Sequence, residues 1–306
     1  MAPRSLPGVL AAALLVLAPL AGCGGDAEPP RPDLVLVSTR DGDYALYAMD
    51  ADGSRQTRVS EDERGDATSA RRLFFQIDPA WSPDGRRIAF ASRRAGTFDL
   101  YVMNVDGTGT RRLTSGPAED RHPSWSPDGS RLVFERDESD LVVVRADGTG
   151  LRRLTGPSAS ESQPAWSPDG SRIAYVRREI GRQEEELWLM AANGSDARRL
   201  TFLGATSQHP AWSPDGARLA FSSNAGGPFF DVYVLTVGRK GVRRLTSVGA
   251  DAIEPSWSPD GRLIAFSRDG AIVTVDEARE EETLTDSDNN DFSPAWNPVP
   301  REAETG

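Results

Sequence analysis

Six copies of one short motif set the strongest limit on the fold of this chain. The motif PAWSPDG begins at Pro79, returns four times in close form, and ends as a shortened PAWNP that begins at Pro294. Each copy carries one tryptophan: Trp81, Trp125, Trp166, Trp212, Trp257 and Trp296. These tryptophans lie 44, 41, 46, 45 and 39 residues apart, a spacing typical of β-propeller blades.

The motif itself predicts a β-hairpin. Pro83 fixes φ at the second position of a tight turn, Asp84 can bond its own backbone, and Gly85 accepts a positive φ. Short strands flank the turn, so the tryptophan points to one sheet face and the small residue before it points to the other. We expect this alternation of large and small residues to let neighbouring sheets interlock.

The strand count predicts how the ring closes. The first strand set covers Leu34 to Ser38, Tyr44 to Met49 and Thr57 to Ser60 and lacks the motif hairpin, whereas no strand follows the last motif copy. Joined, the two ends complete one blade and remove the open sheet edges. We therefore predict an all-β fold over residues 34–300, a six-bladed β-propeller of four-stranded antiparallel blades closed by the N- and C-terminal strands together.

The N-terminal segment predicts export and a lipid anchor. Arg4 precedes an apolar run from Val9 to Leu20 that is short for a membrane span and has the form of a cleaved signal. The following Leu-Ala-Gly-Cys resembles a bacterial lipobox, which implies a lipoprotein signal peptide over 1–22 and lipid attachment at Cys23. Residues 23–33 then form a flexible tether, and 301–306 a C-terminal tail. The alternative is a plain secretory signal.

Composition narrows the partners. The formal net charge is -11, which disfavours binding to nucleic acid and to anionic lipid headgroups. Arg-Arg pairs recur once in most repeats, and we interpret them as solvated strand edges. Cys23 is the only cysteine, so no intrachain disulfide can form. We expect a monomer that is held at the bacterial cell envelope, in the periplasm or on the outer face of a membrane.

The repeat resembles that of the TolB family, whose tandem units have the form xPxWSPDGxxIAFxS followed by LYVMNxDGTxxRRLT. The likeness covers nearly everything from Leu34 to Pro298. It implies a propeller with protein interactions in the cell envelope. That family usually carries an extra N-terminal domain, for which the segment between Cys23 and Leu34 has no room, so a role in a Tol-type system stays open.

The connections between strands predict a uniform face and a varied face. In a four-stranded meander, the loops that enter the first strand share a face with the loops between the second and third strands, whereas the tight turns lie opposite. The connection from Ser60 to Pro79 is ten residues longer than the others. Variable loops on a rigid scaffold commonly carry binding. We expect a partner-docking rim there at Phe74, Phe75, Phe229 and Phe230, with strand starts or a satellite core as the alternative.

One polar residue precedes each blade-opening proline and is expected at the mouth of the central channel. The six are Asp78, His122, Gln163, His209, Glu254 and Ser293, and they include both histidines of the chain. Such groups suit a polar ligand or a divalent metal. Three alternatives stay open: a solvated mouth, a ligand or metal site, and an enzyme resembling oligogalacturonate lyase, whose metal site uses His and Gln ligands.

Catalytic signatures are otherwise missing from the sequence. No G-x-S-x-G, H-E-x-x-H, C-x-x-C or nucleotide-binding motif occurs. The acidic stretch from Asp286 lacks the glycine and the closing glutamate of an EF-hand loop. We therefore predict no cofactor and a non-catalytic scaffold that binds a protein, a peptide or an envelope polymer, with a channel-mouth metal or carbohydrate site, in a sensor or an enzyme, as the alternative.

Overall fold

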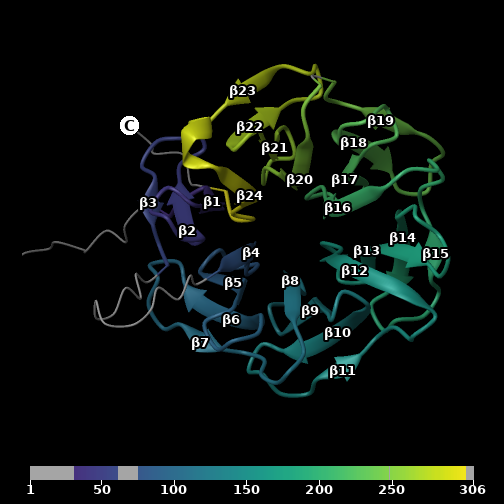
Figure 1. Cartoon of the computed structure of the whole chain (residues 1–306), viewed down its shortest axis with the longest axis horizontal. Helices are drawn as coiled ribbons and strands as arrows, with labels where there is room; N and C mark the ends of the chain where they lie inside the picture. The colour runs from purple at the N-terminus through teal and green to yellow at the C-terminus, as the bar shows by residue number, and fades with distance from the viewer. Residues whose placement is uncertain (1–30, 61–74, 248, 301–306) are drawn as a thin grey trace, which may run out of the picture. The chain divides into compact units, whose positions relative to one another are not determined.

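Six four-stranded antiparallel sheets follow one another along the chain. The computed structural model describes residues 31–60, 75–247 and 249–300, and Figure 1 shows the sheets arranged around a central opening. The innermost strands are β4 (Gln76–Trp81), β8 (Asp120–Trp125), β12 (Ala159–Trp166), β16 (Ser207–Trp212), β20 (Ala252–Trp257) and β24 (Asp291–Trp296). Each ends at the tryptophan of a motif copy. The fold is the predicted six-bladed all-β propeller.

The remaining strands complete the blades outward. The second strands are β1 (Leu34–Ser38), β5 (Arg87–Ser92), β9 (Arg131–Arg136), β13 (Arg172–Glu179), β17 (Arg218–Ser223) and β21 (Ile264–Arg268). The third strands are β2 (Ala45–Met49), β6 (Asp99–Asn104), β10 (Asp140–Arg145), β14 (Glu186–Ala191), β18 (Asp231–Thr236) and β22 (Ala271–Val275). The outermost strands are β3 (Thr57–Arg58), β7 (Arg111–Arg112), β11 (Arg152–Arg153), β15 (Arg198–Arg199), β19 (Val242–Arg244) and β23 (Glu281–Thr283).

The two ends of the chain share one blade. Strand β24 pairs with β1 in the sheet order β24-β1-β2-β3, with Trp296 opposite Leu34 and Ala295 opposite Val35. In Figure 1 the yellow β24 lies beside the purple β1. The predicted closure is confirmed, and it pairs the outer edge of β24, which would otherwise be open.

Several predicted boundaries are wrong in detail. Strand β2 starts at Ala45, because Tyr44 instead forms an isolated bridge with Phe75. The fourth strands are only two or three residues long, so the first of them ends at Arg58 and not at Ser60. The acidic stretch after Asp286 forms a short 3-10 helix, Ser287–Asn289. No helix in the described ranges has the length and apolar character needed to cross a membrane.

Tryptophans link four of the six blades to the blade before them through an indole hydrogen bond. Trp166 Nε1 instead donates to the Gly170 carbonyl of its own turn, and Trp296 Nε1 has no hydrogen-bond partner among the described residues. Trp125 packs in one buried cluster with Ala80 of the preceding blade, and its Nε1 donates to the Ala80 carbonyl at 3.2 Å. Arg87, also from that blade, lies 4.8 Å from the centre of the Trp125 ring. Trp81, Trp212 and Trp257 make the same bond to Ala295, Ala165 and Ala211. The predicted interlocking of large and small residues is therefore confirmed, with a hydrogen bond added.

The Arg-Arg pairs do more than solvate the edges. The second arginine of a pair reaches back to an acid at or just before the start of the third strand, as Arg112 does to Asp99 at 2.6 Å. The corresponding pairs are Arg58 with Asp43, Arg153 with Asp140, Arg199 with Glu186, and Arg244 with Asp231. These ion pairs tie the short outer strands to their blades, while the arginines stay largely exposed, as expected of solvated strand edges.

A buried hydroxyl group caps the third strand of each blade. Thr114 Oγ1 accepts the backbone N–H of Leu100 at 3.0 Å, and the same bond recurs at Ser60, Thr155, Thr201, Thr246 and Thr285. Since Leu113 donates to the Leu100 carbonyl, both polar groups of Leu100 face the outer strand. The hydroxyl therefore satisfies an N–H that the two-residue outer strand cannot.

Replacing Thr114 by valine tests this capping. Thr114→Val keeps the shape of the side chain and leaves the Leu100 N–H unpaired, so we expect the free energy of unfolding to fall by about 1–3 kcal/mol. The exposed Thr283→Val in β23 is the matched control and should change it by less than about 0.5 kcal/mol. Urea unfolding measures both, and an equal loss in the two variants would contradict the capping role.

Candidate functional site

A left-handed residue stands before each blade-opening proline. The φ angles of Asp78, His122, Gln163, His209, Glu254 and Ser293 all lie between 49° and 58°. The register between each innermost strand and its neighbour shifts at the same place. These are β-bulges, which bend a strand and re-aim a side chain. The bulge at these positions was not predicted from the sequence.

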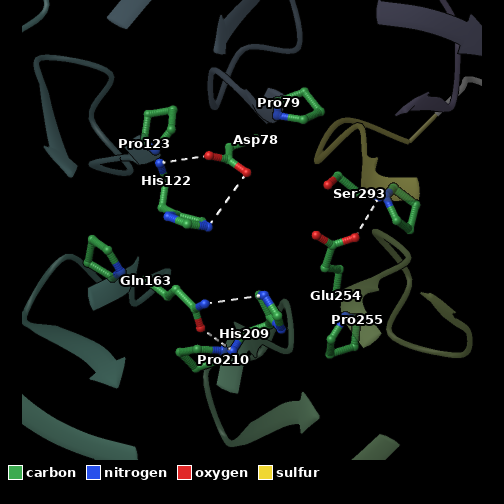
Figure 2. Close-up of a pocket in the computed structure, with 12 residues that line it drawn as sticks. Asp78, Pro79, His122, Pro123, Gln163, His209, Pro210, Glu254, Pro255 and Ser293 are labelled. Carbon is green, nitrogen blue, oxygen red and sulfur yellow. Dashed lines mark hydrogen bonds and ion pairs between the residues drawn. The ribbon is translucent and has the colours of Figure 1, made fainter. Parts of the chain in front are cut away.

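The bulges bring the six side chains together at one mouth of the channel. With the prolines that follow them, they line a pocket of about 170 Å³. Figure 2 shows the six polar groups around the opening and the proline rings beside them. We call this pocket, lined by these twelve residues, the polar mouth. Its polar residues lie three residues before the tryptophan in every innermost strand, on the side of the variable loops and away from the tight turns.

Side chains of one blade hold the bulge of the next. The His122 N–H donates to Asp78 Oδ2 at 3.2 Å, and the His209 N–H donates to Gln163 Oε1 at 2.8 Å. The Ser293 N–H donates to Glu254 Oε2 at 2.8 Å. Three of the six ring side chains thus orient the backbone of their neighbour, so the polar mouth is a connected network.

Glu135 belongs to this network although the sequence analysis passed over it. It lies on β9 with 3% of its surface exposed, and its Oε2 accepts the N–H of Gln163 at 3.1 Å. It also lies 3.0 Å from His122 Nδ1. The other blades carry alanine, valine or serine at this register: Val37, Ala91, Val176, Ser222 and Ser267. A glutamate at a register where the other blades carry small or apolar residues was the sequence signal that could have identified Glu135.

His122 is held in its charged form. Burial, the largest single influence, disfavours the imidazolium, but the charge of Asp78 and the contact with Glu135 outweigh it. The result raises the pKa of His122 to about 9. Its Nε2 lies 3.6 Å from Asp78 Oδ1, so the ring sits between two carboxylates.

His209 is held neutral. Burial, the largest influence, and the nearby His122 charge lower the pKa of His209 to about 4, against the opposite effect of Glu254. The two imidazole rings lie 6.4 Å apart between centroids, and His209 Nε2 lies 3.3 Å from the Gln163 amide nitrogen. The two histidines therefore differ in charge at neutral pH although both occupy the same position in the repeat.

The ring does not have the geometry of a metal centre. Among the residues that the structure describes, no three His, Cys, Asp or Glu side chains converge closely enough to hold an ion. Asp78 and Glu254 come from different blades, and Glu135 is engaged by His122 and Gln163. The polar mouth instead offers separated acceptors around an opening with proline walls.

The predicted phenylalanine rim is only partly a surface. Phe75 lies 4.6 Å from Tyr44 between ring centroids and packs against the cluster of Phe98, so it covers a satellite core, as the alternative had it. Phe229 is 43% exposed and Phe230 is partly buried. Phe74, Cys23 and most of the long connection lie outside the described residues.

Two other exposed apolar residues on the same face as Phe229 were not predicted from the sequence. Ile180, in the β13–β14 loop, is 79% exposed, and Phe202, between β15 and β16, is 73% exposed. Together with Phe229 in the β17–β18 loop they all lie on the face of the polar mouth, in two successive blades. We call these three residues, Ile180, Phe202 and Phe229, the apolar loop residues. Leu151, at 49%, lies in a tight turn on the opposite face.

Opposite pH dependence of stability is expected from the two histidines. The raised pKa of His122 gives stability that is complete below about pH 6.5 and is lost as pH rises through about 9. The lowered pKa of His209 gives stability that is complete above about pH 6.5 and is lost as pH falls through about 4.

The test compares His122→Gln and His209→Gln with the parent protein in urea unfolding from pH 4 to 10. The destabilisation by His122→Gln should shrink above pH 8, and that by His209→Gln should shrink below pH 6. The same trend with pH in both variants would contradict the assigned charges.

Comparisons with known proteins agree with this architecture. The family model of the TolB beta propeller domain matches residues 70–183 and 135–300. The Tol-Pal system protein TolB of Anaeromyxobacter dehalogenans (strain 2CP-C) is 38% identical over 93 residues, which is 30% of this chain and 19% of that protein. The chain thus matches well under two thirds of this relative's length.

Solved structures show the same fold. The crystal structure of TolB from Acinetobacter baumannii superposes with a TM-score of 0.73 at 20% identity, covering 88% of this chain and 67% of that one. A putative TolB from Agrobacterium tumefaciens gives a TM-score of 0.62 at 21% identity, covering 89% of this chain and all of the other. Since the family model covers more than half of the sequence, this chain belongs to the TolB beta propeller domain family.

Proposed function

We propose that this chain is a non-catalytic binding propeller of the bacterial cell envelope, which docks a protein or peptide partner on the face of its variable loops. One observation carries the proposal. Three of the four large hydrophobic side chains that are exposed among the described residues lie on that face, in two successive blades. Exposed apolar groups that share a face with a polar pocket are typical of interaction sites.

The opposite face is built for uniformity. Its tight turns repeat one bonding pattern, in which Gly85 donates to the Ser82 carbonyl at 2.9 Å and Asp84 Oδ1 accepts the Arg86 N–H at 3.1 Å. The same turn recurs in the other complete motif copies. A face made of one repeated turn offers little to distinguish partners, whereas the loops differ in length and sequence.

The described chain enters the propeller on the face of the tight turns. Arg31 Nη1 bonds the Asp84 carbonyl there, and Asn297 Nδ2 bonds the Pro32 carbonyl. The first described residues therefore lie on the tight-turn face and do not cover the variable loops.

The relatives suggest the class of partner. The relative from Anaeromyxobacter dehalogenans is named a Tol-Pal system protein, so we propose an envelope protein as the partner and action as a monomer. Lipid attachment at Cys23 and placement in the periplasm or on an outer membrane face are parts of the same proposal.

Crosslinking in cells tests the docking face. The full chain, tagged at its C-terminus, is crosslinked in the cells that produce it, and bound proteins are quantified by mass spectrometry. Phe202→Ser and Phe229→Ser should each reduce recovery of the specific partner about tenfold, which corresponds to about 1.4 kcal/mol per side chain.

Leu151→Ser is the control, because it removes a comparable exposed side chain from the opposite face. It should leave recovery unchanged. Full recovery with both loop variants, or a loss confined to Leu151→Ser, would place the docking site elsewhere.

A further inference from the structure

The polar mouth has an excess of negative charge. Asp78, Glu135 and Glu254 contribute three carboxylates to this region, and His122 is the one cationic side chain among them. The Glu254 charge raises the pKa of both Asp78 and His122, so these groups share one electrostatic environment. A cationic group that enters the pocket would offset this excess.

One carboxylate is turned to receive such a group. Glu254 Oε2 is engaged by the Ser293 N–H at 2.8 Å and by Ser267 Oγ at 3.1 Å. The other oxygen of Glu254 points into the opening, and Asp78 lies two blades further around the ring, beyond Ser293 (Figure 2). The protein thus fixes Glu254 through one oxygen and leaves the second directed at the pocket.

The walls select the shape of the cation. Six proline rings line the pocket together with the polar groups, and its volume of about 170 Å³ leaves room for one long side chain, since roughly 10–15 Å³ by the same measure holds one water. The acceptors come from different blades, so a compact ammonium with three donors fits them better than the planar, parallel fork of a guanidinium. An aliphatic stem would lie against the prolines.

The channel beyond the prolines sets the depth of insertion. The same six prolines also bound a cavity of about 550 Å³ whose remaining lining is the alanines, serines, tryptophans and second prolines of the motif copies. A charged group that passed the polar ring would lose its carboxylate partners in these mostly apolar surroundings. The ammonium would therefore stop at the ring.

We propose that the polar mouth binds the ammonium group of a lysine side chain, which a protein partner inserts from the face of the variable loops. This inference rests on the proposed function and deepens it. The apolar loop residues then supply contact area around the pocket. The polar mouth selects partners that present an exposed lysine there. Specificity arises because a neutral side chain would desolvate the second Glu254 oxygen without pairing it.

Small probes test this without any partner. Two probes are titrated into the purified full-length protein and followed by saturation-transfer NMR. One is Nα-acetyl-lysine N-methylamide, which keeps the side-chain ammonium. The other is the matching norleucine amide, which has a similar stem and no charge. The lysine probe should bind with a Kd on the order of 1 mM, and the norleucine probe about tenfold more weakly or not at all.

Variants locate the binding. Glu254→Gln keeps an acceptor for the Ser293 N–H and should weaken the lysine probe about tenfold, the loss expected for one charged hydrogen bond. Asp78→Asn provides a second, independent test with the same expected direction. Glu282→Gln, an exposed acid on β23, should change nothing.

Equal binding of the two probes, no binding of either, or the same loss in Glu282→Gln as in Glu254→Gln would overturn the proposal. Because these titrations use no partner, failed crosslinking in cells would count against the docking face alone. Failed titration would count against the lysine pocket alone.

Discussion

The left-handed bulge before each blade-opening proline is the constraint on which the site depends. A residue with a side chain adopts this conformation at a cost of roughly 1–2 kcal/mol, and glycine would adopt it with little strain. All six positions nevertheless carry side chains, and Gln163, Glu254 and Ser293 are not among the residues enriched at a positive φ. The strain is offset by bonds from the preceding blade, such as Asp78 to the His122 N–H. Strain held in place by the surrounding fold is a common property of functional sites.

The blades divide the work of the molecule between two faces. Tryptophan-to-carbonyl bonds, caps such as Thr114 and the arginine pairs of the outer strands repeat with little change and fix the ring. The ring does not depend on the variable loops for these contacts, so Ile180, Phe202 and Phe229 can stay exposed. The polar mouth combines both properties. Its backbone conformation is the same in every blade, while its six side chains differ in charge, size and protonation.

The sequence allowed the fold to be predicted because the repeat fixes both spacing and register. The positions of the six tryptophans predicted the number of blades, and the incomplete strand sets at the two ends predicted the closure between β24 and β1. The set from Asp78 to Ser293 followed from the same register. A site residue is easy to place when every copy of a repeat must supply one.

The missed features depend on contacts between repeats. Glu135 contacts His122 across the β8–β9 pair of its own blade. It also accepts the N–H of Gln163 from the next blade, a contact that exists only when the two blades are in place. The opposite charges of His122 and His209 depend on which neighbours surround two equivalent positions. Phe75 and Phe229 each belong to a Phe-Phe pair in the sequence, yet Phe75 packs against Tyr44 whereas Phe229 is exposed to solvent. Such differences come from tertiary packing and are not visible in local patterns.

The most direct measurement compares Ser293→Gly with Ser293→Ala in urea unfolding. Both variants remove the same hydroxyl, so their difference reports the backbone conformation at this ring position. A left-handed residue predicts that the glycine variant is the more stable, by about 1 kcal/mol. A more stable alanine variant would mean that Ser293 is an ordinary extended strand residue, and it would contradict the bulge that turns the six side chains into the polar mouth.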